Sequence, residues 1–181
     1  MSDRKIITSD RKPAPKPDVV NVHTLSMLVS NKPGVLGRIC QVFSRRGFNI
    51  DSLVVSQGGD PRFSRMTVGI SGHPEGLQQI IMQCNKLIDV VHCYEHTDKE
   101  AVVKELVLVK LIVDAAHRTE VLQIVEHFSG KTVDFQEDSL VLMIAGNTDK
   151  VDAALNLLAK FEITETVRTG KVVMARGATA T

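Results

Sequence analysis

The sequence predicts an α+β protein built from two tandem βαββαβ units. Apolar residues alternate along eight segments, which is typical of strands, and recur at i, i+3, i+4 and i+7 along four others, which is typical of helices. The elements follow the order strand, helix, strand, strand, helix, strand, and the same order then repeats. Phe43-Ser44 and Phe128-Ser129 lie 85 residues apart at matching places in their helices. Each unit is therefore expected to be ferredoxin-like, with two helices on one face of a four-stranded antiparallel sheet.

The first predicted unit covers residues 22–98. Strands are expected over 23–30, 50–57, 63–71 and 90–96, with a Gly-Gly-Asp-Pro turn at 58–61 between the second and the third. The first helix is expected to end at Gly47. Its apolar stripe, and that of the second helix, consist of Leu36, Ile39, Cys40 and Phe43, and of Leu77, Ile80, Ile81 and Cys84.

The second predicted unit covers residues 103–177. A strand is expected over 105–113, a hairpin over 132–135 and 140–146, and one last strand over 164–174. The two helices between these strands carry the stripes Val121, Ile124, Val125 and Phe128, and Val151, Ala154, Leu155 and Leu158. Units of about 75 residues bury little surface alone, so oligomerisation is expected.

Charge and hydropathy exclude two classes of protein. The 181 residues are 43% hydrophobic, and 22 Lys and Arg against 21 Asp and Glu give a net charge of +1. This balance lacks the broad positive field of non-specific nucleic-acid binding, and no apolar run reaches the roughly 18 residues of a membrane span. We expect a soluble cytoplasmic protein without a nucleic-acid or membrane partner.

Residues 1–21 are expected to form a flexible tail. Pro13, Pro15 and Pro17 alternate there with other residues, a pattern that blocks helix formation and supplies nothing to bury. The segment also lacks the apolar run of a secretory signal.

No catalytic or metal site is predicted. The chain has no G-x-G-x-x-G, Walker, G-x-S-x-G or H-E-x-x-H motif. His92 and His96 share one strand face but are separated by roughly 13 Å, too far to ligate one metal. Three cysteines without a C-x-x-C pair indicate neither a disulfide framework nor a zinc ribbon. Cys40 and Cys84 are expected in the core, whereas the pattern leaves Cys93 undecided.

The segment Asn31–Arg38, between the first strand and the first helix, has the features of a small binding site. Pro33 lacks an N–H that a helix start would leave unpaired, and Gly34 allows a ligand to approach the backbone. The free N–H groups of the first helical turn favour a carboxylate. Asn31 offers a donor and an acceptor, which suits a ligand that carries both an ammonium and a carboxylate group.

Val35, Leu36 and Ile50 would supply an apolar wall for a small aliphatic side chain. From the local pattern alone, however, a capped helix with a turn glycine and no ligand is the favoured interpretation. The second unit modestly favours binding, because it keeps the fold pattern without these residues. At the 85-residue offset, Asn31, Pro33, Gly34 and Asn49 correspond to Ala116, Arg118, Thr119 and Asp134.

Several stretches of the chain match a known family. HTLSMLVSNKPGVLGRICQVFSRRGFNIDSLVV at 23–55 combines N-x-P-G-V-L with R-G-F-N-I fifteen residues on, and PRFSRMTVGISG follows at 61–72. With VVKELVLVKLIV, SLVLMIAGNTDKVDAALNLL and VRTGKVVMARG further on, residues 22–177 closely resemble the regulatory small subunit of acetolactate synthase, or acetohydroxyacid synthase. The first unit resembles an ACT domain.

This resemblance implies a non-catalytic subunit in branched-chain amino acid biosynthesis, the route to valine and isoleucine. Such a subunit binds and activates the thiamine-diphosphate-dependent catalytic subunit and confers feedback inhibition by valine, or by leucine or isoleucine. Thiamine diphosphate, FAD and magnesium would belong to the catalytic subunit, and no cofactor is expected on this chain. The resemblance implies that the 103–177 domain serves activation, and Arg65 is a candidate for contact with the catalytic subunit.

The resemblance also implies where the effector binds. ACT domains of this type pair side by side as a homodimer, with the effector at the interface. Asn31, Gly34, Val35 and Leu36 match the loop that holds the effector backbone, and Asn49 with Ile50 matches the wall from the partner. Gly37 stands where some relatives carry Ser.

Three other classes of protein share parts of this pattern. An RNA-binding βαββαβ module needs aromatic residues on its central strands, where this chain has LVV and MTVGI. An acylphosphatase-like enzyme needs a polar phosphate loop, and the G-V-L segment is too apolar for one. The remaining alternative is a stand-alone ACT-type amino-acid sensor that regulates another metabolic enzyme.

Overall fold

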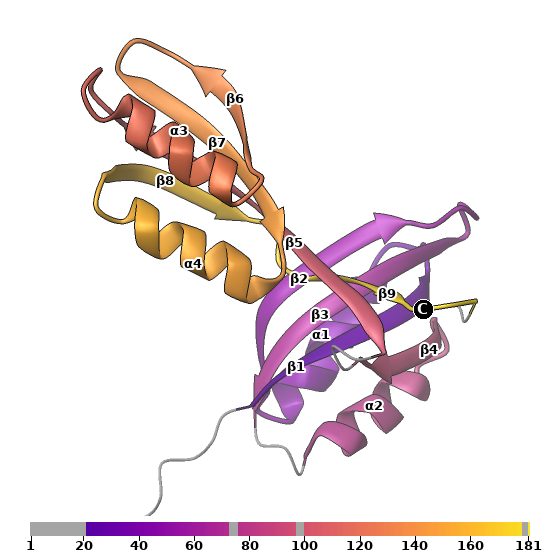
Figure 1. The fold of residues 1–181 in the computed structure, drawn as a ribbon. Coiled ribbons are helices and arrows are strands. Elements are labelled where there is room, and N and C mark those ends of the chain that lie inside the picture. Colours follow the sequence, from indigo (N-terminus) through magenta and orange to yellow (C-terminus); the bar gives the residue numbers. More distant parts are fainter. Residues whose placement is uncertain (1–20, 73–75, 97–99, 179–180) are drawn as a thin grey trace, which may run out of the picture.

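The computed structural model describes residues 21–72, 76–96, 100–178 and 181. The expected tail at 1–21 lies outside these residues except for Asn21, which begins the first strand. The chain forms two units, each an antiparallel sheet with a pair of helices on one face (Figure 1). Within the described ranges, no helix has the length and apolar character that a membrane span requires.

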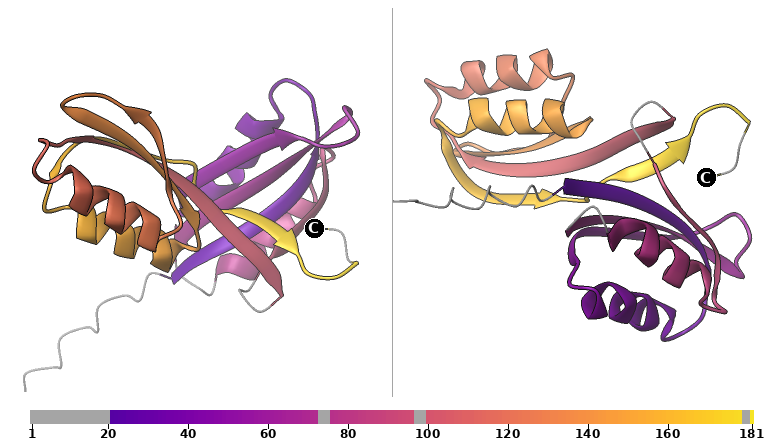
Figure 2. Two further views of the ribbon diagram at one scale, coloured as in Figure 1. Left: turned by 45° about the horizontal axis from the view of Figure 1, so that its top comes forward. Right: turned by 90° about the horizontal axis from the view of Figure 1, so that it is seen from below.

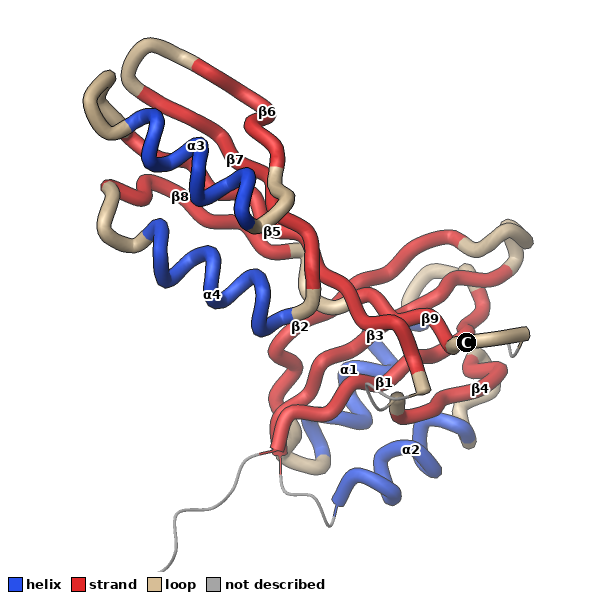
Figure 3. Tube along the Cα trace, viewed as in Figure 1, coloured by secondary structure: helices blue, strands red, loops and turns tan. Residues whose placement is uncertain are grey.

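The first unit contains all six predicted elements. Its sheet has the strand order β2-β3-β1-β4, and both helices lie on one face of it (Figure 3). The stripe residues Phe43 and Ile80 are fully buried against that face. The stripe predicted for the first helix is wrong at its start, where Val35 is buried and Leu36 is exposed. The elements are β1 (Asn21–Ser30), α1 (Val35–Arg45), β2 (Asn49–Gln57), β3 (Phe63–Gly72), α2 (Leu77–Asn85) and β4 (Val90–Glu95).

The cysteines of the first unit serve mainly its core. Cys84 on α2 and Cys93 on β4 are fully buried, while Cys40 on α1 is only partly covered. Contact with the Cys84 thiol and burial raise the pKa of Cys93. A thiol that stays protonated behaves as a small apolar side chain, which answers the question that the sequence left open at Cys93.

The second unit repeats the architecture with one more strand. Its sheet has the order β6-β7-β5-β8, and the additional strand β9 pairs with β5. The buried stripe residues of its helices include Val121, Val151 and Leu158. The elements are β5 (Ala101–Ile112), α3 (Arg118–His127), β6 (Lys131–Phe135), β7 (Ser139–Gly146), α4 (Thr148–Leu158), β8 (Glu162–Arg168) and β9 (Val172–Ala175).

The last strand differs from its prediction. The run expected as one strand over 164–174 is divided into β8 and β9 by Gly170, whose φ of 81° is accessible mainly to glycine. β5 begins at Ala101 rather than at residue 105, because its first four residues pair with β9. Its remaining residues pair with β7 and β8, so β5 extends from one unit to the other.

The paired segments of β5 and β9 cover the open face of the first sheet (Figure 2). In the right-hand view they lie on the side of β1 opposite to α1 and α2. Ser26 and Thr67 alternate with the core residues of their strands, so they point to that open face, and they are only 1% and 8% exposed. Val173 of β9 is 7% exposed. The first unit is thus packed on both faces of its sheet.

A charged cluster marks the place where β5 changes its strand partners. Glu105 is buried, and its carboxylate accepts a hydrogen bond from Arg168 at 2.5 Å. Arg168 also donates to Asp152 at 2.7 Å. Since an unpaired buried carboxylate is costly, Arg168 ties β8 and α4 to this point of β5.

The open face of the second sheet carries a partly exposed apolar row, beside the charged residues Lys110 of β5 and Glu165 of β8. Val167, Leu108 and Met143 are register partners across β8, β5 and β7. Val167 is 51% exposed and Leu108 36% exposed. Because α3 and α4 lie on the opposite face (Figure 1), the described part of the chain leaves this row uncovered.

Two neighbouring leucines on α4 provide a test of the second core. Leu158 is fully buried, whereas Leu157 is 50% exposed. Leu158→Ala is expected to lower the free energy of unfolding by about 2–5 kcal/mol, because it leaves a cavity. Leu157→Ala, measured in the same urea titrations, should change it by at most about 0.5 kcal/mol. Equal losses from the two variants would contradict this packing.

Candidate functional site

The amino terminus of α1 has unpaired backbone donors. Gly34 is its N-cap, with a φ of 82°, and no side chain caps the helix. Within the described residues, the N–H groups of Leu36 and Gly37 have no acceptor, and the first turn holds no acidic residue. Free N–H groups at the positive end of the helix dipole form a site for a carboxylate.

Asn31 is oriented beside this helix start by the turn before β3. Its backbone N–H donates to the carbonyl of Arg62 at 2.8 Å, and its Nδ2 donates to the carbonyl of Pro61 at 3.0 Å. Both bonds use donors of Asn31. Its Oδ1 therefore remains available to accept a hydrogen bond from an ammonium group.

The two apolar residues that follow Gly34 point in different directions. Val35 is 3% exposed and belongs to the core of the first unit, so only its backbone can face a ligand. Leu36 is 41% exposed and is available as an apolar wall.

Asn49 and Ile50 lie at the start of β2. Asn49 is exposed, and its Nδ2 donates to Asp51 Oδ1 at 2.5 Å. The same carboxylate oxygen accepts a hydrogen bond from Ser71 Oγ at 3.0 Å. Ile50 is half-buried against the core.

Within one chain, the two predicted groups of residues are far apart. Asn31 is bonded to Arg62, just before β3, whereas Asn49 is the register partner of Ser71 near the end of β3. Nine residues of extended chain between Arg62 and Ser71 span roughly 30 Å. One small ligand cannot touch both groups in a single copy.

The residues that hold these groups in place were not predicted. The Pro61 carbonyl accepts from Asn31 and also from Gln57 Nε2 at 3.4 Å, so the end of β2 lies beside the Asn31 loop. Asp51 orients Asn49 at the other end of β2. The sequence indicated a turn at 58–61, but it carries no signal for which carbonyl or carboxylate accepts a bond.

The turn that presents Pro61 is closed by an ion pair. Arg62 donates from its backbone N–H to Asp60 Oδ1 at 3.0 Å and from Nη2 to Oδ2 at 2.6 Å. These hydrogen bonds from the side chain and backbone of Arg62 lower the pKa of Asp60.

The corresponding helix in the second unit is built differently. Glu120 lies in the first turn of α3, and Asp114 accepts the backbone N–H of His117 at 2.9 Å. Hydrogen bonds from the backbone and the side chain of His117, and a further one from the backbone of Ala116, lower the pKa of Asp114. Acidic side chains therefore lie at the start of α3, whereas the first turn of α1 has none.

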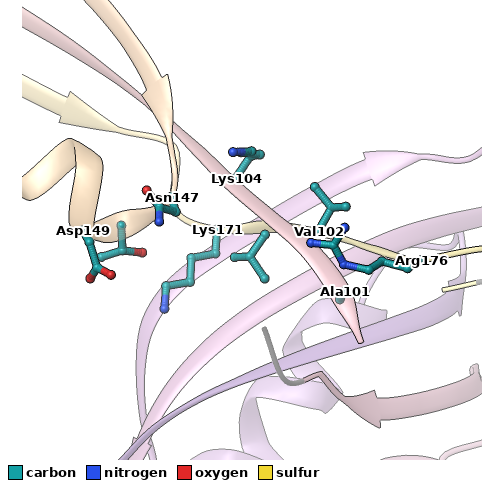
Figure 4. A pocket seen from close by; sticks show the side chains of 9 residues that line it. Ala101, Val102, Lys104, Asn147, Asp149, Lys171 and Arg176 are labelled. Atoms are coloured by element: carbon teal, nitrogen blue, oxygen red, sulfur yellow. The ribbon is translucent and has the colours of Figure 1, made fainter. Parts of the chain in front are cut away.

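A second location borders the junction of the units but lacks a free helix terminus. A cavity of about 350 Å³ lies beside β5, β9 and the start of α4 (Figure 4), with Lys104, Lys171 and Arg176 in its lining. Asn147 Oδ1 caps α4 by accepting the N–H of Lys150 at 3.2 Å. The residues of this lining were not predicted from the sequence as a site.

His92 on β4 and His96 directly after this strand form local contacts. His92 stacks on Tyr94 at 5.0 Å, and His96 Nε2 lies 2.5 Å from Ser26 Oγ. In the described part of the chain, no three metal-binding side chains cluster. Burial lowers the pKa of His96, and burial with the nearby charge of Arg65 lowers that of His92.

These shifts predict a loss of stability in acid. A histidine whose pKa falls below its unfolded value of about 6.5 favours the neutral folded state. Its contribution is complete above that value and is lost as the pH falls through the folded pKa. The free energy of unfolding in urea is therefore expected to be lower at pH 5.5 than at pH 7.5. The variant H92Q/H96Q should show a smaller difference; an unchanged difference would exclude these histidines as its source.

Comparison with known proteins gives a consistent set of matches. Residues 25–92 match the family described as an AHAS small subunit-like ACT domain, and residues 104–177 match the small subunit of acetolactate synthase. The acetolactate synthase small subunit of Mycobacterium bovis is 43% identical over 86% of this chain and 92% of its own length. The chloroplastic small subunit 2 of Arabidopsis thaliana is 38% identical over 97% of this chain, which corresponds to 36% of the plant protein.

A solved structure agrees with these sequence matches. The small subunit of acetolactate synthase from Thermotoga maritima superimposes with a TM-score of 0.79 at 36% identity. The match covers 88% of this chain and 99% of that one. The similarity therefore includes both units and not the ACT-like unit alone.

Proposed function

Because the chain belongs to the acetolactate synthase small-subunit family, we propose that it activates the catalytic subunit and confers feedback inhibition by a branched-chain amino acid. The family is the non-catalytic regulatory part of the enzyme, so this chain is not itself a catalyst. The observation that carries the effector part of the proposal is the uncapped start of α1 at Gly34. Thiamine diphosphate, magnesium and FAD would belong to the catalytic subunit.

The loop supplies complementary groups for an amino acid. The carboxylate would accept the N–H groups of Leu36 and Gly37, and Gly34 leaves the approach open. The ammonium group would donate to Asn31 Oδ1. An aliphatic side chain would then lie on Leu36, which favours valine, leucine or isoleucine over a polar amino acid.

A second copy of the chain would complete the site. β2 is an edge strand of its sheet, and antiparallel pairing of two such edges about a two-fold axis sets the start of one β2 beside the end of the other. The end of β2 adjoins the Asn31 loop through Gln57 and Pro61. The partner's Asn49 and Ile50 would therefore reach an effector held by this loop, although both lie far from it within one chain.

Inhibition would follow from linkage between two sites. An effector that binds one arrangement of the paired units better than another shifts the population toward it. A coupling free energy of roughly 1–3 kcal/mol would suffice for strong regulation.

The exposed face of the second sheet is the better candidate for contact with the catalytic subunit. Arg65 was the candidate for this contact from the sequence. Its side chain already donates to the carbonyl of Thr181, and it lies on the face of the first sheet that β5 and β9 cover. The row formed by Val167, Leu108 and Met143 is apolar; the first two residues are exposed and Met143 is partly exposed. Exposed apolar patches on soluble proteins commonly mark partner sites.

Acetolactate formation by the catalytic subunit, with and without this chain and across a valine titration, tests the function. We expect activation and inhibition by valine. Gly34→Asp should abolish the inhibition because it places a carboxylate where the effector carboxylate binds. Gly34→Asn introduces nearly the same shape and backbone strain without the charge, so it should retain more of the inhibition.

Each outcome of this titration is informative. Activation without sensitivity to valine, leucine or isoleucine would keep the partner and reject the effector. No activation would reject the proposal in favour of a sensor for another enzyme. Equal effects of Gly34→Asp and Gly34→Asn would assign the loss to backbone strain.

Two variants test the proposed partner surface. Each introduces one carboxylate, the first on the open sheet face of the second unit and the second on its helical face. Val167→Asp is expected to weaken the apparent affinity for the catalytic subunit by at least about tenfold, because a carboxylate resists burial in an apolar interface. Leu157→Asp changes a residue of similar exposure, 50% against 51%, on the helical face and should have little effect. The measurement is the activity of the catalytic subunit as each variant is titrated into it. Equal apparent affinities of the two variants for the catalytic subunit would reject this surface.

A further inference from the structure

The link between β8 and β9 touches β2 at Ser52. A side chain added at Gly170 would bring its Cβ to 2.7 Å from Ser52 Cβ and 3.2 Å from Ser52 Oγ. A Cβ added at Gly69 of β3 would lie 2.5 Å from the same Oγ. Distances under about 3 Å do not occur between such atoms, so Ser52 fits between two positions that only glycine can fill.

On the first unit, this contact is close to the proposed effector wall. The pairing of β2 with β3 shifts register between Ile50 and Ser52, which leaves Asp51 in a bulge. Asp51 holds Asn49 through its side chain. The segment from Asn49 to Ser52 therefore connects the effector wall directly with the link at Gly170.

On the second unit, the same contact leads to the junction in β5. Gly170 directly follows Thr169, whose backbone N–H donates to the carbonyl of Leu106 at 3.0 Å. Arg168, one residue earlier, binds the buried Glu105. A displacement of Gly170 would be transmitted to the strand that both units share.

The surroundings leave room for such a displacement. A cavity of about 510 Å³ borders this contact, and its lining includes Asp51, Ser52, Glu105, Arg168 and Gly170. The contact is thus well packed on one side and open on the other, which allows the link to adopt a second position.

We infer that the contact between Ser52 and Gly170 couples effector binding in the first unit to the second unit and thereby to the catalytic subunit. This inference rests on the proposed function. Ser52 and Gly170 touch neither the Gly34 loop nor the exposed row of the second sheet, so they are positioning residues. Their change should alter the response to the effector while effector binding and activation persist.

Gly170→Ala tests the coupling. The methyl group would displace the link from Ser52, and saturating valine should inhibit the holoenzyme at least about threefold less than it inhibits the wild type. The dissociation constant for valine, measured by calorimetry on the full chain, should stay within about twofold. Basal activation should remain.

Gly177→Ala is the matched control. Gly177 has a similar φ of 75°, but an added Cβ there meets nothing within 4 Å. Its substitution imposes the same backbone strain without the contact, and valine inhibition should be that of the wild type. In S52G/G170A the missing Ser52 side chain gives the methyl group space, so inhibition should recover in part.

Full valine inhibition in Gly170→Ala would overturn the inference, as would an equal loss in Gly177→Ala. If Gly170→Ala unfolds at a lower temperature and fails to activate the catalytic subunit, Ser52→Gly is the deciding variant. It removes the contact without adding strain at Gly170. Unchanged valine inhibition in Ser52→Gly would overturn the coupling. Failure of the proposed function is seen separately, because the wild-type chain would then neither bind valine nor confer inhibition.

Discussion

The architecture depends on one strand that belongs to two layers. The first four residues of β5 pair with β9 over the first sheet, and the remainder pairs with β7 and β8 in the second. Residues of β5 are paired on both sides of the junction, so the two units are joined by a hydrogen-bonded strand. The buried Glu105 lies where the partners change, and its pairing with Arg168 ties β8 to this point.

This arrangement explains an otherwise unusual distribution of polarity. The open face of the first sheet carries small hydroxyl residues such as Ser26 and Thr67, yet it is covered. The open face of the second sheet carries Leu108 and Val167, yet it is exposed. Short polar side chains permit close approach of a strand pair, whereas an exposed apolar row is costly unless a partner covers it. In the proposed function, the first sheet would serve contact within the chain and the second sheet contact with the catalytic subunit.

Most of the fold follows from periodicity, and the departures have local causes. All four helices were predicted because an apolar residue at every third or fourth position has few other interpretations. The stripe of α1 was partly wrong, because Val35 rather than Leu36 is buried at its start. The break at Gly170 was not predicted, because TVRTGKVV continues the alternation of a strand on both sides of the glycine. Gly170 has a left-handed φ. It lies where the chain passes from β8, which pairs with residues 107–112 of β5, to β9, which pairs with residues 101–104. In the candidate site, the loop at Asn31 and Gly34 was identifiable, but the supporting roles of Pro61 and Asp51 arise only from tertiary contacts.

The separation of Asn31 from Asn49 has a thermodynamic consequence for the proposed site. If each effector is held by the helix start of one copy and by the β2 start of another, effector binding and self-association stabilise each other. The amino termini of α1 and α2 both lack a side-chain cap and an acidic residue in the first turn, whereas α3 carries acidic groups at its start and α4 is capped by Asn147. In the loop before α1, which also carries Asn31, a ligand carboxylate would supply what side chains supply to α3 and α4. Regulation would then use a local deficiency of the fold, satisfied only when the effector and the second copy are both present.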